Sequence, residues 1–242
     1  MIWTRTKAIE KISESDCDMK ILEKDFPIFP LNTVLFPQAR MPLYIFEPRY
    51  REMIERCVDE DLAFGVMLIK AGTEVGAPAT PHAIGTVARI VEIARAADGS
   101  MNIGIMGVTR FKLLESSTQR AYLTGSIQVM PDENLDLGKI EFTARRTMQV
   151  FKAYVNKIKS ISEMEETENE EFELPKDPLH LSYLIAANIP ISNPDRQSLL
   201  EAKTVKDRMQ REILFLEREL SLLKMVTESS ERAHDQGSFS MN

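Results

Sequence analysis

Two cysteines and three histidines are the residues of this 242-residue chain best suited to nucleophilic or metal chemistry. They are Cys17, Cys57, His82, His180 and His234. No pair of them has the short spacing at which zinc ligands usually occur, and two thiols make no disulfide framework. The sequence therefore predicts no metal site. A thiol hydrolase built on Cys57 and His82 is the enzymatic alternative.

Cys57 falls on an apolar helical face within the stretch 48–58. Residues on that face are spaced as on one side of a helix, which begins at a first-turn proline: Tyr50, Met53, Ile54, Cys57 and Val58. A reactive thiol needs a nearby base and a partly open, cationic setting. The buried stripe instead favours Cys57 as a small core residue.

Other sequence motifs of catalysis are missing. The nearest approach to a phosphate-binding loop is residues 137–140, Leu-Gly-Lys-Ile, which lacks the first glycine and the final hydroxyl of that motif. No Gly-x-Ser-x-Gly, His-Glu-x-x-His or Gly-x-Gly-x-x-Gly pattern occurs. We therefore predict a protein that is not an enzyme and that uses no cofactor.

Composition limits the kinds of partner. The net charge is −7, with 30 basic and 37 acidic residues, and no run of lysine and arginine exists to neutralise phosphates, so we expect no nucleic-acid binding. No apolar run approaches the ~20 residues that span a bilayer, so we expect no membrane partner. Residues 1–24 lack the apolar core of a signal peptide, which predicts a cytoplasmic location.

A proline-rich stretch, Phe26–Tyr50, is the element around which the rest is organised. Its prolines exclude a helix and are tolerated at edge strands, so we predict short strands at 27–31, 34–36 and 41–46. Further strands are expected at 64–69, 85–93, 101–114 and 121–129, with an Asp-Gly turn at 97–100.

From Glu141 the apolar period becomes helical. We predict a helix through Phe151, an exposed glutamate-rich loop at 163–173, helices starting after Asp177 and at Asp195, and a last helix capped by Thr204. That last helix has an apolar seam: Val205, Met209, Ile213, Leu216, Leu220 and Leu223. Packing inside its own bundle is the favoured interpretation, and self-association is the alternative.

These segments, in order, resemble the substrate-binding amino-terminal domain of Lon-type ATP-dependent proteases. The likeness runs through 27–50, 84–88, 98–99 and 107–111 and through the helices from Asp177 onward, so that it covers roughly Asp25 to Lys224. The resemblance implies an α+β fold, in which a PUA-like mixed β-barrel is followed by an α-helical bundle ending in a long helix.

The resemblance also predicts how the chain is divided and what it does. We expect a flexible leader at 1–24, a β subdomain at 25–135, a helical bundle at 136–227 and a flexible tail at 228–242. A stand-alone Lon domain without ATPase or protease modules would bind unfolded or peptide segments of other proteins, as an adaptor or chaperone-like binder, with an ATPase or protease acting in trans. Alternatives are an oligomeric scaffold using the last helix, the hydrolase using Cys57, and RNA binding, which the acidity opposes.

The predicted peptide-binding residues are Leu35, Phe36 and Pro37. This segment puts bulky apolar side chains beside a proline that interrupts strand pairing, which leaves them able to face outward. The alternative is that Leu35 and Phe36 belong to the barrel core, since most large apolar side chains are buried.

Overall fold

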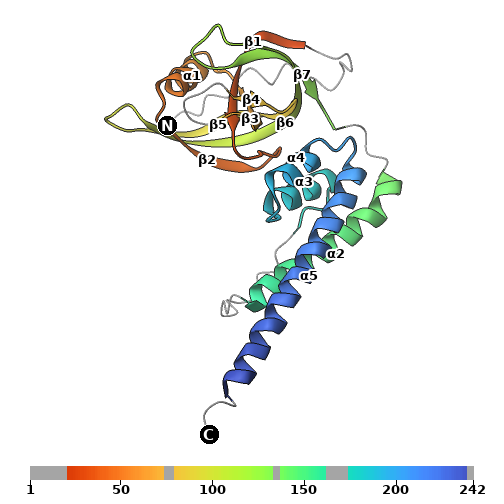
Figure 1. The fold of residues 1–242 in the computed structure, drawn as a ribbon. Helices are drawn as coiled ribbons and strands as arrows, with labels where there is room; N and C mark the ends of the chain where they lie inside the picture. Colours follow the sequence, from red (N-terminus) through yellow and green to blue (C-terminus); the bar gives the residue numbers. More distant parts are fainter. Residues whose placement is uncertain (1–20, 74–78, 133–136, 162–173, 239–242) are drawn as a thin grey trace, which may run out of the picture. The chain divides into compact units, whose positions relative to one another are not determined.

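Alternating and apolar strands build the first part of the chain, and helices with apolar stripes build the second (Figure 1). The computed structural model describes residues 21–73, 79–132, 137–161 and 174–238. Its strands are β1 (Ile21–Leu31), β2 (Arg40–Ile45), β3 (Phe64–Ala71), β4 (Thr80–Pro81), β5 (Ile84–Arg95), β6 (Met101–Ser117) and β7 (Thr124–Met130). Its helices are α1 (Pro48–Asp59), α2 (Leu137–Ile161), α3 (Pro178–Asn188), α4 (Asn193–Leu200) and α5 (Val205–Ser238).

The sheet is mostly antiparallel. Its neighbours run β1-β7-β6-β5-β3-β4, and a parallel pairing of β1 with β3 closes a ring of five strands. β2 stands off this path and pairs with the first half of β6, from Met101 to Met106. An antiparallel sheet followed by helices confirms the predicted α+β class, while the PUA-like detail stays an expectation from the resemblance.

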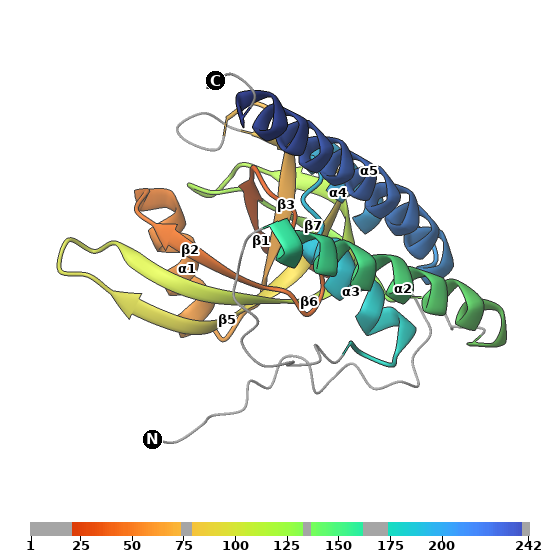
Figure 2. The ribbon, with the colours of Figure 1, turned by 90° about the horizontal axis from the view of Figure 1, so that it is seen from below.

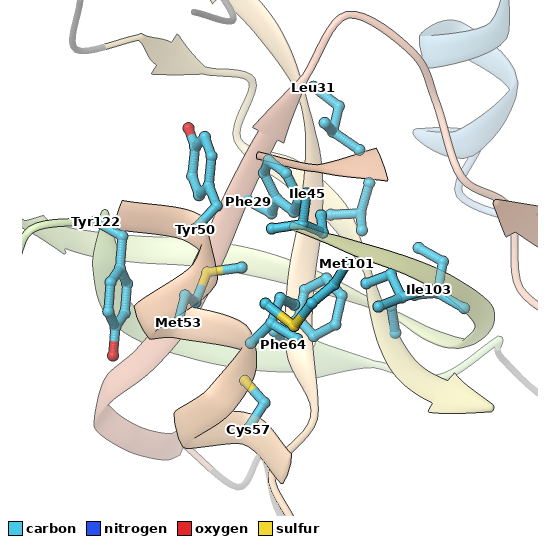
Figure 3. Close-up of a cluster of buried hydrophobic side chains, with 14 of the residues drawn as sticks. Phe29, Leu31, Ile45, Tyr50, Met53, Cys57, Phe64, Met101, Ile103 and Tyr122 are labelled. Atoms are coloured by element: carbon cyan, nitrogen blue, oxygen red, sulfur yellow. The ribbon is translucent and has the colours of Figure 1, made fainter. Parts of the chain in front are cut away.

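Helix α1 covers the core of the β part with four of the five residues of its predicted apolar face, whereas the fifth, Val58, is 38% exposed. Tyr50, Met53 and Cys57 lie among side chains of the surrounding strands (Figure 3). The rings of Phe29 and Tyr50 pack with their centroids 4.1 Å apart. Met53 is completely buried, and the side chains of α1 pack with those of β1, β3 and β6 in one core.

The segment between β1 and β2 differs from its prediction, because residues 34–36 form no strand. Instead, the Ala39 N–H donates to the Phe36 carbonyl, and Gln38 has a φ of 67°, as expected for the third position of a type II turn that begins at Phe36. The N–H of Gln38 donates to the Gly107 carbonyl. This turn redirects the chain into β2. It is supported by Gly107, where a Cβ would come within 2.2 Å of the Phe36 carbonyl oxygen.

A second core belongs to the helices. Phe151 of α2, Leu181 and Ile185 of α3 and Leu216 of α5 are buried together. α2 lies along α5 in both views (Figures 1 and 2). The Asp177 carboxylate accepts from the His180 N–H at 2.9 Å and so caps α3 as predicted.

Helix α4 corrects one predicted boundary. The chain divides into Met1–Asp132 with Ser192–Glu201, and Glu133–Ile191 with Ala202–Asn242. The predicted bundle, 136–227, included α4, whereas polar contacts tie α4 to the β unit. The Arg110 guanidinium donates to the Leu200 carbonyl at 2.9 Å, and the Gln197 amide donates to the Ile84 carbonyl at 3.0 Å. Arg110 thus has a structural role in holding α4 against the sheet.

Two predicted ends also change. β1 begins at Ile21, inside the predicted leader 1–24, of which residues 1–20 lie outside the described part. α5 continues to Ser238, so most of the predicted tail 228–242 is helical. The predicted loop at 163–173 lies outside the described residues. None of the helices in the described part of the chain combines the length and the apolar character needed to cross a membrane.

Candidate functional site

The predicted peptide-binding residues are buried. Leu35 is 2% exposed and Phe36 is fully buried, and Pro37 is buried as well. The Leu35 carbonyl accepts from the Thr86 hydroxyl at 2.6 Å, and the Arg196 guanidinium lies over the Phe36 ring. Because these side chains complete the core of the β unit, the prediction that they form an exposed contact is wrong, and the core alternative holds for Leu35 and Phe36.

Cys57 is placed for packing and not for nucleophilic attack. Burial raises the pKa of its thiol to about 12, with the nearby Arg56 opposing that shift. Only a trace of thiolate would form at neutral pH. His82 approaches Glu201 instead, with Nδ1 3.7 Å from Oε1. Across the described residues no hydrogen bond joins Cys57 to His82, so the structure gives the hydrolase alternative no support.

The described residues also contain no cluster of metal ligands. In the part of the chain that the structure describes, no group of three His, Cys, Asp or Glu side chains is close enough to hold a metal ion. Exposed apolar surface is the other signature of a binding site.

β2 supplies such a surface. Along this strand Arg40, Pro42 and Tyr44 are exposed, whereas Ile45 is buried in the α1 core. Tyr44 is 57% exposed and Phe46, just after the strand, is 50% exposed. Their rings stack with centroids 5.8 Å apart. We call Pro42, Tyr44 and Phe46 the β2 face.

Alternation explains why these residues share one side. Successive side chains of a strand point to opposite faces, so even-numbered residues of β2 face outward while Met41, Leu43 and Ile45 pack inward. β6 is the single strand with which β2 pairs among the described residues. Tyr44 on this edge strand and Phe46 just after it leave apolar area in water, and covering that area with a partner would be favourable.

A shallow depression adjoins the β2 face. It has a volume of about 220 Å³ and is lined by Arg40, Met41, Pro42, Val91, Glu92, Gly104 and Ile105. Register puts Pro42 opposite Gly104 and Gly104 opposite Glu92, so the hollow crosses three adjacent strands. A Cβ at Gly104 would come 3.3 Å from the Glu92 Cβ, so glycine helps to keep the floor low. We call this hollow the first depression.

A second depression, of about 250 Å³, shares Val91 and Glu92 with the first. Its remaining lining comes from the end of α1, from the segment between α1 and β3, and from β5: Cys57, Val58, Asp61, Leu62, Ala63, Arg89, Ile90 and Ile93. β5 is irregular between Ile90 and Glu92, and this bulge places Val91, which is 41% exposed, between the two hollows. Strands β2, β6 and β5 and helix α1 thus frame one interrupted apolar surface.

Sequence reasoning missed this surface although it included Tyr44 and Phe46 in a predicted strand. The available signal was two aromatic residues, two positions apart, in a strand with a proline that marks it as an edge. Val91 carried no such signal, because its exposure depends on the bulge.

Comparisons with known proteins point to one family. Residues 25–218 match the family described as the ATP-dependent protease La (LON) substrate-binding domain. Lon protease of Anaeromyxobacter dehalogenans is 29% identical over 202 residues, which are 82% of this chain and 24% of that protein. The chain spans about a quarter of the length of the curated relatives it matches.

Two solved structures share the fold. The Lon N-terminal domain protein from Xanthomonas campestris aligns with a TM-score of 0.57 and 24% identity, over 78% of this chain and 96% of that one. The N-terminal domain of Mycobacterium avium complex Lon protease aligns with a TM-score of 0.59 and 18% identity, over 80% and 98%. With the family match covering most of its length, the chain belongs to the Lon substrate-binding domain family.

Proposed function

We propose that this chain is a non-catalytic recognition module that binds extended, apolar segments of unfolded polypeptides through the β2 face and the first depression. The observation that carries the proposal is the stacked, exposed pair Tyr44 and Phe46 beside that hollow. Unfolded chains expose the apolar side chains that such a surface covers, whereas folded proteins bury them.

The strength of this binding follows from area. Burying apolar surface stabilises a complex by about 25 cal/mol per Å², and an extended segment across a shallow surface also loses conformational freedom. An open hollow of about 220 Å³ holds little more than one large side chain. We therefore expect weak binding that tolerates many sequences, which suits a module that must accept varied clients.

Family membership supports the same role. The matching relatives are named Lon proteases, and this chain corresponds to about a quarter of their length. We propose that bound clients are presented to an ATPase or protease, with the chain acting as a cytoplasmic adaptor or chaperone-like binder.

Fluorescence anisotropy with a labelled, permanently unfolded client tests the proposal. The test variant is Tyr44→Ser combined with Phe46→Ser, and both changes fall on exposed positions, so folding should be retained. The matched control is Phe142→Ser on α2, an exposed aromatic at 78%. We expect at least a fivefold loss of affinity for the double variant and none for the control. Equal affinities for the parent protein, the double variant and the control would contradict the proposal.

A further inference from the structure

The second depression combines apolar walls with unpaired charge. Val58, Leu62 and Ile93 line it together with Asp61, Glu92 and Arg89. One guanidinium nitrogen of Arg89, Nη2, is buried without a hydrogen-bond partner. Among the described residues no ion pair joins Arg89 to Asp61 or Glu92, so two acids and one base line the hollow without pairing with one another.

The end of α1 adds to the negative potential. The Leu62 N–H donates to the Cys57 carbonyl, and the Asp61 N–H reaches toward the Val58 carbonyl, which is the hydrogen-bond pattern of a Schellman cap. Asp61 occupies the left-handed position of this cap, with a φ of 53°. Glycine is the residue that normally stands there.

Three consecutive acids stand at the end of this helix: its last residue Asp59, the C-cap Glu60, and Asp61 after it. Stability alone favours the opposite choice, because the carbonyl end of a helix is the negative end of its dipole and is stabilised by cations. Glu60 pairs with Arg56 at 3.2 Å, and of the three acids only Asp61 lines the hollow. A sequence that departs from the local stability rules on both backbone conformation and charge points to selection for binding.

We infer that the second depression selects polypeptide segments in which a large apolar side chain adjoins a lysine or arginine. The apolar side chain enters between Val58, Leu62 and Ile93. The cationic group lies near Asp61 and Glu92. This inference rests on the proposed function and names the substrate class within it.

Charge complementarity decides between basic and acidic clients. Two carboxylates against one guanidinium leave the lining net negative, and the helix end strengthens that sign. An acidic segment would meet repulsion from Asp61 and Glu92. Because exposed ion pairs are individually weak, the preference for basic over acidic segments should be about two- to tenfold and should fall as salt rises.

Two labelled peptides provide the test, each with the same Leu-Phe centre flanked either by lysines or by glutamates. Kd is measured by anisotropy at low and high salt with the complete chain. The test variants are Asp61→Gly and Glu92→Gln, and the matched control is Glu115→Gln, an exposed acid on β6 outside both depressions.

We expect the lysine peptide to bind more tightly to the parent and to Glu115→Gln, and the preference to shrink about twofold or more in each test variant. Asp61→Gly also removes a non-glycine residue from a left-handed backbone position, so the melting temperature of this variant should stay unchanged or rise. A fall in selectivity without a fall in melting temperature separates an effect on binding from an effect on folding. Equal affinity for both peptides, or preference for glutamate, would overturn the inference while leaving the proposed function intact. Binding of neither peptide would instead overturn the proposed function.

Discussion

Glu212 in α5 makes a pH-dependent prediction about the stability of the helical unit. Its side chain is fully buried, and neither carboxylate oxygen has a hydrogen-bond partner. Burial raises the pKa of Glu212 well above its usual value of 4.5, and the Arg208 guanidinium one turn earlier opposes that shift only in part. Arg208 is itself engaged by the Ser182 and Tyr183 hydroxyls, at 2.9 and 3.1 Å.

The raised pKa fixes the sign of the effect. The folded state holds the Glu212 proton more tightly than the unfolded state, so this group favours folding most below pH 4.5. As pH rises from 4.5 toward the folded pKa, the unfolded state ionises first and stability falls. For one proton the slope is at most about 1.4 kcal/mol per pH unit.

Glu212→Gln removes this titration while keeping the shape of the side chain. Urea unfolding followed by helical circular dichroism at pH 5, 6, 7 and 8 should show the variant gaining on the parent as pH rises. Glu217→Gln is the control, since Glu217 is 46% exposed and pairs with Arg146 at the surface. If the difference between Glu212→Gln and the parent were the same at every pH, the reasoning would be refuted.

Three further substitutions test the fold. Phe36→Ala should lower the free energy of unfolding by about 3 to 5 kcal/mol in urea titrations, because the ring is fully buried. A loss below about 1 kcal/mol would show that Phe36 is exposed. Leu216→Asp should unfold the helical unit, seen as lost helical circular dichroism, because a carboxylate would replace a fully buried side chain; a folded variant that only changes from oligomer to monomer in light scattering would favour the scaffold alternative. Gln38→Gly should raise the free energy of unfolding by up to about 1 kcal/mol, and with it the melting temperature, because glycine adopts a φ of 67° without strain. An unchanged or lower melting temperature would show that Gln38 is not strained in the turn.

Local patterns were enough to predict most elements. The helical spacing from Tyr50 to Cys57, the Asp177 cap and the Thr204 cap all correspond to observed features, and Thr204 accepts from the Asp207 N–H at 3.1 Å. The seam residues Val205, Met209 and Leu216 pack inside the helical unit as favoured. Such signals are carried by neighbours in the chain, so a sequence displays them.

The site depended on contacts that a sequence does not display. Leu35 and Phe36 were expected at the surface because a proline follows them, but long-range contacts with Thr86 and Arg196 bury them. α4 was assigned to the bundle because it is a helix among helices, whereas Arg110 and Gln197 link it to the β unit. The exposure of Tyr44 and Val91 required the register of β2 on β6 and the bulge of β5.

Hydrogen exchange of backbone amides, measured with and without a saturating unfolded client, tests the central claim most directly. We predict that slowed exchange on binding concentrates at residues 40–46 and 89–93, where the β2 face and the two depressions lie, with no change at 34–37 in the core. Protection confined to the helical unit, with residues 40–46 and 89–93 unchanged, would contradict it.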